Sequence, residues 1–188
     1  FDTVITLIGF ADSQQTYDAW SNAVHQQYIY MHKLFDTYHS YENEGIVSVY
    51  TLNEKAAKEP IKVDPILYGL LKFCKSHYDT CQGQTNVAMG SVLSIWHNYR
   101  GAGLNDPLHA ELPPMEILSE AALHTNINDL IIDVDACTVW LADPRMTLDV
   151  GAIAKGYAVE MTARMLEERG ISGFVINVGG NVRTVGTK

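Results

Sequence analysis

Apolar residues recur at two different periods along the chain, and each period predicts a different kind of element. Residues 3–9 form a short apolar run that predicts a strand. The next segment places apolar residues every three or four positions, which predicts a helix with Ser13 as its N-cap. This helix is expected to end before the polar and aromatic stretch 37–41. Its apolar positions are Tyr17, Trp20, Val24, Tyr28, Met31 and Phe35.

Three further helices are predicted in the middle of the chain. Asp64-Pro65 is typical of a helix start, because Asp is a good N-cap and Pro fits the first helical position. The apolar face of this helix continues until Gly83. Residues 84–100 predict another helix and residues 115–124 a short one. The glycines and prolines of 101–114 predict a loop between them.

Short apolar runs then predict strands. Segments 130–133 and 138–141 flank Asp135-Ala136 and predict a β-hairpin. A turn at 143–145 leads into residues 146–149, which predict a third short strand.

The last forty residues combine a helix with a second hairpin. Gly170 is the expected C-terminal stop of the helix. Segments 174–178 and 181–185 predict strands joined by the turn Gly179-Gly180. The apolar face of the helix is formed by Ile153, Tyr157, Met161 and Met165. Because helices and hairpins are interleaved, the predicted fold class is α+β with antiparallel sheet.

Length and charge limit the possible functions. The chain has 188 residues, which is typical of one large domain. It carries 13 Lys and Arg against 22 Asp and Glu, a net charge of −9. This balance argues against nucleic acid as a partner, since duplex binders need clustered basic side chains. The three cysteines form no CxxC or Cys/His cluster and predict neither a disulfide framework nor a zinc site.

The segment from Asp149 to Tyr157 carries the strongest candidate chemistry. Its small residues lead into the N-terminus of the predicted helix, where free N–H groups and the helix dipole favour an anion. Lys155 lies in or near the first turn, where a cation is unfavourable unless an anion compensates it. Asp149 alone, or Asp149 with a ligand phosphate, could supply that anion. Asp149 could also bind a divalent cation. The plainer alternative is that Asp149 only caps the helix and Lys155 is solvated.

Two other segments can be interpreted either as structural features or as parts of a binding site. Gly179-Gly180-Asn181 is most simply a type I′ hairpin turn. The stretch 37–41 contains aromatic side chains that could stack on a planar ring, but a polar loop would have the same composition. The seven histidines are scattered, and we interpret them as mostly surface residues.

Several blocks closely resemble the ApbE family of FAD:protein FMN transferases, particularly its Gram-positive members. The most specific are DVGAIAKGYAV at 149–159 and NVGGNVR at 177–183, with LEERGI at 166–171 between them. Weaker blocks lie in the same order at 1–4, 35–38 and 83–96. The resemblance covers nearly the whole chain and implies an ApbE-like, T-fold-related domain.

The resemblance implies transfer of FMN from FAD to a Thr or Ser hydroxyl of an acceptor flavoprotein, with Mg²⁺ required and AMP released. Lys155 would hold the FAD phosphates, Asp149 would be a polar contact to the cofactor, and the Ala152 carbonyl would bind Mg²⁺. Tyr38 would contact the flavin or adenine ring, and Phe1 stands where the family has Met. The remaining residues expected to line the cofactor site are Gln84, Thr85, Asn86, Gly179 and Gly180.

The chain also departs from the family pattern. Asn86 replaces the usual Asp, which removes a negative charge, and Ser91 replaces the usual Pro. The family's other Mg²⁺ ligands and its catalytic segment lie downstream of the Gly-Gly hairpin, so no catalytic residue is predicted within this chain. We expect residues 1–188 to be the N-terminal part of one longer domain, because a sheet that ends after Val185 would leave an unpaired edge. Family members are usually exported and lipid-anchored, which predicts an extracytoplasmic, membrane-anchored protein.

Two alternatives to FMN transfer stay open. A flavin carrier would bind FAD without reacting, and an FAD pyrophosphatase would use water in place of an acceptor hydroxyl. The products separate the three functions. Transfer leaves flavin on a denatured acceptor, hydrolysis gives free FMN and AMP, and a carrier returns intact FAD.

Overall fold

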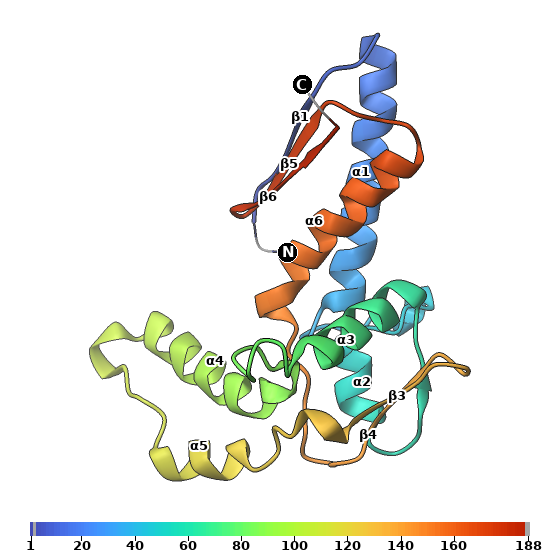
Figure 1. The fold of residues 1–188 in the computed structure, drawn as a ribbon. Helices are drawn as coiled ribbons and strands as arrows, with labels where there is room; N and C mark the ends of the chain where they lie inside the picture. The colour runs from blue at the N-terminus through green and yellow to red at the C-terminus, as the bar shows by residue number, and fades with distance from the viewer. Residues whose placement is uncertain (2, 187–188) are drawn as a thin grey trace. The chain divides into compact units, whose positions relative to one another are not determined.

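Two stretches that are far apart in the sequence form one compact unit, and the chain between them forms another (Figure 1). The computed structural model describes residues 1 and 3–186. The first unit combines residues 1–35 with the described residues from Gly151 onward, and the second unit is Asp36–Val150.

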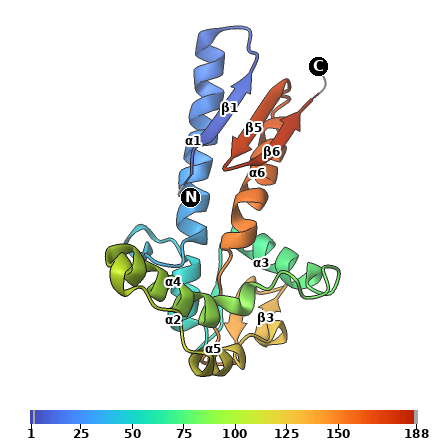
Figure 2. The same cartoon turned by 90° about the vertical axis from the view of Figure 1, so that its left-hand side faces the viewer.

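The first unit is a three-stranded antiparallel sheet with two helices against one face (Figures 1 and 2). Strand order is β1-β5-β6, so the N-terminal strand pairs with the C-terminal hairpin. The elements are β1 (Ile5–Gly9), α1 (Gln14–Phe35), α6 (Gly151–Glu168), β5 (Phe174–Val178) and β6 (Asn181–Val185). This arrangement confirms the strand, the long helix and the hairpin predicted for these segments.

A close cross-strand contact fixes the register of β1. Gly9 pairs with Phe174, and a Cβ built on Gly9 would lie 2.4 Å from the Phe174 ring. The ring is fully buried and makes an edge-on contact with Trp20 at 5.4 Å between centroids. The absence of a side chain on Gly9 therefore lets the largest core ring of this unit lie between sheet and helix.

The second unit is built from helices around a small antiparallel sheet of order β2-β4-β3. Its buried apolar side chains come mainly from α2, α3, β4 and the segment 146–150. In chain order the elements are η1 (Glu42–Glu44), α2 (Val49–Lys55), β2 (Ile61–Lys62), α3 (Pro65–His77), η2 (Val87–Met89), α4 (Gly90–Asn105), η3 (Pro107–His109), α5 (Met115–Ala122), η4 (Ile127–Asp129), β3 (Leu130–Asp133) and β4 (Thr138–Leu141).

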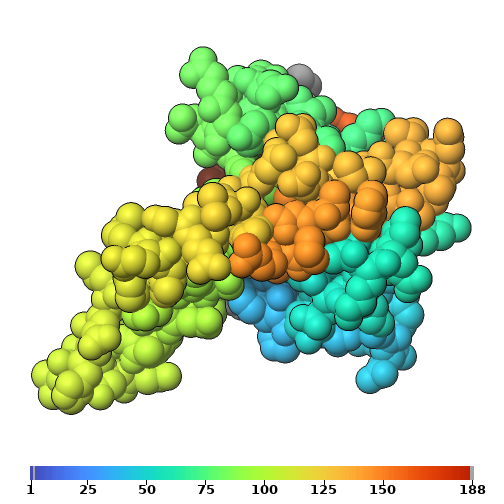
Figure 3. Space-filling model, turned by 90° about the horizontal axis from the view of Figure 1, so that it is seen from below, coloured from blue at the N-terminus to red at the C-terminus, as the bar shows by residue number. Residues whose placement is uncertain are grey.

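The prediction of a loop over 101–114 was wrong in its first part, because α4 continues to Asn105 through Gly101 and Gly103. Glycine lowers helix propensity by about 1 kcal/mol but does not forbid a helix. A Cβ on Gly103 would lie 3.1 Å from the Cβ of Ala110, so the following chain packs closely against this position. The second half of α4 and helix α5 extend away from the rest of the unit, as the yellow-green part of Figure 3 shows.

The third strand predicted at 146–149 was also wrong. Residues 146, 148 and 150 are buried while 147 and 149 are half-buried, which is the period of a strand, but the segment belongs to no sheet. Instead, the backbone of Leu148 pairs with a side chain. Asn53 Oδ1 accepts from the Leu148 N–H at 2.7 Å, and Asn53 Nδ2 donates to the Leu148 carbonyl at 3.0 Å.

Other boundaries differ from the predictions because of local hydrogen bonding. Helix α3 begins at Pro65 with Asp64 as its N-cap, as predicted, but ends at His77 and not near Gly83. The pattern also missed α2, whose start is fixed by a reciprocal capping box between Ser48 and Thr51. The predicted hairpins and the α+β class are confirmed. Among the described residues, none of the helices has the length and apolar content needed to cross a membrane.

Candidate functional site

A cleft of about 290 Å³ lies within the second unit and brings together four separate segments of its chain. Tyr38 and Asp149, two of the residues predicted to bind the cofactor, are on its wall. The full lining is Thr37, Tyr38, Tyr50, Asn53, Glu54, Gly90, Ser94, His97, Asn98, Thr147, Leu148 and Asp149. The cleft therefore combines aromatic rings from three segments, Tyr38, Tyr50 and His97, with polar groups.

Asp149 is held on the cleft wall by backbone hydrogen bonds at the residue itself and at the two residues before it. Its own N–H donates to the Val87 carbonyl at 2.8 Å, and the preceding Leu148 is paired with Asn53. One residue further back, the Gly90 N–H donates to the Thr147 carbonyl at 3.0 Å. Asp149 thus follows a short segment whose backbone is fixed at three successive positions.

Tyr38 and His97, which also line the cleft, form an aromatic pair. Their ring centroids are 5.0 Å apart with 30° between planes, and Tyr38 Oη lies 3.5 Å from His97 Nδ1. Tyr38 is 56% exposed, so much of its ring is available to a ligand. An exposed aromatic face of this kind can stack on a planar heterocycle.

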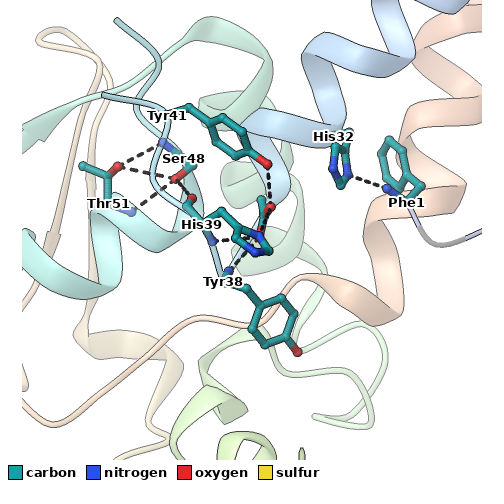
Figure 4. A network of polar contacts seen from close by, with 8 residues as sticks. Phe1, His32, Tyr38, His39, Tyr41, Ser48 and Thr51 are labelled. Carbon is teal, nitrogen blue, oxygen red and sulfur yellow. Dashed lines mark hydrogen bonds and ion pairs between the residues drawn. The ribbon is translucent and has the colours of Figure 1, made fainter. Parts of the chain in front are cut away.

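The loop that carries Tyr38 is organised by the buried carboxylate of Asp36. Figure 4 labels three residues of this loop, Tyr38, His39 and Tyr41. Asp36 Oδ1 accepts from the N–H groups of Tyr38 and His39, at 2.7 and 3.2 Å. Oδ2 accepts from Tyr41 Oη at 2.8 Å and lies 2.9 Å from His39 Nδ1. Burial acts to raise the pKa of the Asp36 carboxyl, but these hydrogen bonds outweigh burial and hold it below the usual value. Burial and the bond to Asp36 raise the pKa of Tyr41 to about 12.

The lowered pKa of Asp36 predicts a contribution to acid sensitivity. Stability from a depressed carboxyl is present above its unfolded pKa of about 4 and is lost as the pH falls through the lower folded value. Between about pH 4 and pH 2, the free energy of unfolding of Asp36→Asn should therefore decrease less with falling pH than that of the wild type. Urea unfolding of both proteins across this range measures the effect, and parallel pH profiles would contradict it.

The predicted residues Gln84, Thr85 and Asn86 are not among those that line the cleft. Gln84 is exposed, and Asn86 caps η2 by accepting from the Ala88 N–H at 2.9 Å. The Asn86 amide also donates to the Thr125 carbonyl at 2.8 Å. An Asp side chain has no amide donor and could not make this bond to Thr125. The bond is therefore a structural reason for Asn86 in place of the family's usual Asp. Cofactor binding by these three residues stays a prediction.

The first turn of α6 has the exposed backbone that its sequence predicts. Gly151 and Ala152 are exposed, Ala154 is buried, and Lys155 is half-buried at the fifth position of the helix. Among the described residues of the first unit, no carboxylate lies within ion-pair distance of the Lys155 ammonium. Within its own unit, Lys155 is therefore available to an anion.

The turn Gly179-Gly180 is a two-residue hairpin loop with φ of +54° and +92°, as expected of type I′. The Gly180 N–H donates to Asn177 Oδ1 at 3.0 Å. A Cβ on Gly179 would lie 2.5 Å from Thr3 Oγ1, so this position is both left-handed and crowded. The turn prediction is confirmed, while a cofactor contact by either glycine stays a prediction.

Replacing Gly179 by valine should therefore lower the free energy of unfolding by about 1–3 kcal/mol, because a β-branched residue resists positive φ. Gly180→Val is the matched control, since a Cβ at Gly180 meets nothing within 4 Å. We expect a smaller loss there, from backbone strain alone. Thermal unfolding measures the loss of stability in both variants. An unaltered Tm in Gly179→Val would contradict the claim that Gly179 lies in a left-handed and crowded turn.

Phe1 packs against α1 within the first unit. Its ring makes edge-on contacts with Tyr28 and Phe35 at 6.0 and 6.2 Å between centroids. Its backbone nitrogen lies within hydrogen-bonding distance of His32 Nδ1 (Figure 4). These contacts place Phe1 in an aromatic cluster, and its predicted contact with the cofactor stays a prediction.

A second hollow, of about 230 Å³, is lined in part by His124, which forms an unpredicted pair with Asp143. His124, interpreted as a surface residue, is only 12% exposed in its side chain, and its Nδ1 hydrogen-bonds Asp143. Burial acts to raise the pKa of the Asp143 carboxyl, but bonds from the Arg145 N–H and His124 outweigh it and lower the pKa. The pair joins the end of α5 to the turn after β4.

A metal centre is not formed by the described part of the chain. No group of three or more His, Cys, Asp or Glu side chains there could hold a metal ion. The Ala152 carbonyl, the predicted Mg²⁺ ligand, lies at the second residue of α6. A carbonyl oxygen suits a hard cation, but one such group does not make a site.

Sequence reasoning missed three residues that shape the cleft. His97 and Asn53 gave no signal, because their partners lie 59 and 95 positions away in the chain. Asp36 did give a signal in the sequence, because an Asp followed within five residues by Tyr and His donors is typical of a turn stabilised by side-chain hydrogen bonds.

The comparisons with known proteins agree in both sequence and fold. The family described as "ApbE family" matches residues 1–188. An FAD:protein FMN transferase from Klebsiella pneumoniae (strain 342) is 30% identical over 145 residues, which are 77% of this chain and 43% of the relative. One from Treponema pallidum (strain Nichols) is 28% identical over 142 residues, 73% of this chain and 37% of the relative. The chain thus matches less than half the length of these relatives.

Solved structures share the fold. A mutant of the flavin transferase ApbE from Vibrio cholerae superposes with a TM-score of 0.81 at 19% identity, covering 99% of this chain and 60% of that one. The ApbE protein from Thermotoga maritima gives a TM-score of 0.75 at 21% identity, covering 100% and 60%. At these identities the likeness concerns the fold alone.

Proposed function

Because the chain belongs to the ApbE family, whose pattern matches residues 1–188, we propose that the intact protein is an FAD:protein FMN transferase. The names of the Klebsiella and Treponema relatives support this activity. The acceptor is a flavoprotein with a Thr or Ser hydroxyl. This hydroxyl oxygen attacks the FMN phosphorus, the pyrophosphate bond breaks, AMP leaves, and the hydroxyl proton is released.

The observation that best supports the proposal is the availability of the Lys155 cation. It lies in the second turn of α6, close to exposed backbone, and no described carboxylate of the first unit pairs with it. A cation near a helix N-terminus is unfavourable by itself, so an anionic ligand is the expected partner. The pyrophosphate of FAD has the required charge, and Lys155 would hold it and stabilise the charge that develops during phosphoryl transfer.

Other parts of the proposal rest on the family resemblance. We expect Mg²⁺ to be required, with the Ala152 carbonyl as one ligand and the others supplied by a segment downstream of this chain. The described residues do not form that site themselves. The same resemblance is the sole support for an extracytoplasmic, lipid-anchored location.

The test is to incubate the intact protein with FAD, Mg²⁺ and a candidate acceptor flavoprotein. The proposal predicts flavin fluorescence that stays on the denatured acceptor, together with released AMP. An acceptor whose target Thr or Ser is replaced by Ala is the control and should stay unlabelled. Free FMN with AMP would instead indicate a pyrophosphatase, and intact FAD alone would indicate a carrier. Either result would contradict the proposal.

A further inference from the structure

Asp36 is a buried carboxylate whose hydrogen-bond donors all lie in the loop that follows it. Its side chain is only 5% exposed, and the donors are residues 38, 39 and 41. The Asp36 carbonyl in turn accepts from the Tyr50 N–H at 2.8 Å, which ties this residue to α2. The conformation of the loop therefore depends on one charged side chain that is itself anchored in the second unit (Figure 4).

The position of the Tyr38 ring depends on this anchoring more than the position of a buried core side chain would. More than half of the residue is exposed, so burial does not hold its ring in one place. The shortest bond to Asp36 is the one from the Tyr38 N–H, at 2.7 Å. Fixing the backbone at this residue restricts the directions in which the ring can point. In the structure the ring contacts His97 and lines the cleft.

We infer that Asp36 is a positioning residue of the cleft, which acts through Tyr38 and does not itself contact the ligand. It holds the loop so that the Tyr38 ring is ready to stack on a planar group before that group arrives. This inference rests on the proposed function, in which the planar group is the flavin or the adenine ring of FAD. A ring that is already placed avoids the entropic cost of ordering it on binding.

Asp36→Asn is the appropriate variant, because it keeps the size of the side chain and changes only its chemistry. The remaining oxygen can still accept from the two backbone N–H groups. The amide nitrogen that replaces the other oxygen cannot accept from Tyr41 Oη or from His39 Nδ1. The amide can at most donate to these two groups, so two bonds to a charged oxygen are replaced by weaker neutral ones and the anchoring of the loop is reduced.

The experiment is an FAD titration of the intact protein, with the Kd and the quenching of flavin fluorescence as readouts. We expect Asp36→Asn to raise Kd about three- to tenfold and to reduce quenching, because stacking becomes less complete. In a Tyr38→Ala background the same substitution should change Kd by less than about twofold. Asp143→Asn is the matched control. It removes another hydrogen-bonded carboxylate of lowered pKa in the same unit but outside the cleft lining, and it should leave both readouts unchanged.

The outcomes separate this inference from the proposed function. If Asp36→Asn bound FAD with the wild-type Kd, the positioning role alone would be overturned. The same would follow if the changes in binding free energy caused by Asp36→Asn and Tyr38→Ala were fully additive in the double variant. An equal effect of Asp143→Asn would also overturn it, since stability would then be the cause. Intact wild-type protein that binds no FAD would overturn the proposed function and this inference with it.

Tyr41→Phe keeps the inference testable if Asp36→Asn does not fold. It removes one donor to Asp36 and no atom of the cleft lining. We expect a smaller rise in Kd, of about twofold, with reduced quenching. Wild-type quenching and affinity in this variant would contradict the role of the Asp36 network.

Discussion

Replacing Lys155 by alanine is expected to weaken FAD binding by the intact protein roughly 10- to 100-fold. A charge-assisted hydrogen bond to a phosphate contributes about 1.5–3 kcal/mol, and each 1.4 kcal/mol is about tenfold in affinity. The effect should be large because no described carboxylate of the first unit competes for the ammonium, which leaves the interaction available to the ligand. Titration followed by flavin fluorescence measures the change in Kd.

Two controls make this prediction specific. Lys58→Ala causes the same change in net charge at an exposed position outside the cleft lining, and we expect its Kd to match wild type. Lys155→Arg keeps the charge and should retain most of the affinity, although a guanidinium cannot place its donors where an ammonium does. Unchanged affinity in Lys155→Ala would remove Lys155 from the phosphate site. Equal losses in both alanine variants would show that only net charge matters.

The second large effect is expected from Gly90→Ala, which should lower the free energy of unfolding by about 1–3 kcal/mol. A Cβ at this buried position would lie 2.6 Å from the backbone carbonyl oxygen of Thr147. Backbone cannot rotate aside as a flexible side chain can, so the segment before Asp149 must shift and the bond from the Gly90 N–H weakens. Because Gly90 and Thr147 both line the cleft, the shift should also weaken FAD binding.

Gly101→Ala, in the same helix, is the matched control for this prediction. A Cβ there meets nothing within 4 Å, and the position lies inside α4. We expect it to stabilise the protein by up to about 1 kcal/mol, since alanine is the better helix former. Urea unfolding of the two variants gives the comparison. If Gly90→Ala were as stable as Gly101→Ala, the close approach of α4 to Thr147 would be wrong.

Local signals in the sequence were enough for the elements that carry the family blocks. The Asp64-Pro65 cap and the Gly179-Gly180 turn each act within a few residues, and the structure has both. The helix predicted before this turn is also present, but its predicted apolar face was wrong. Ile153, Tyr157, Met161 and Met165 are only half-buried, and the buried face consists of Ala154, Ala158, Val159, Thr162, Ala163 and Leu166. Lys155 could be singled out for the same reason, because a cation near a helix start is visible without any tertiary information.

What the sequence could not give are pairings over long distances. Burial alternates along residues 146–149 as in the predicted strand, but the backbone partner of Leu148 is the side chain of Asn53, 95 residues earlier. No local pattern distinguishes such a segment from a strand. The Tyr38–His97 pair is likewise made by residues 59 positions apart. The aromatic wall of the cleft therefore becomes visible only in three dimensions.

The measurement that tests the central claim most directly is a crystal structure of the intact protein with FAD bound. The account predicts that oxygens of the pyrophosphate lie about 3 Å from Lys155 Nζ. It also predicts that a ring of FAD stacks on Tyr38 in the cleft. A pyrophosphate bound far from Lys155, with the ammonium paired instead to a carboxylate from the downstream segment, would contradict the account.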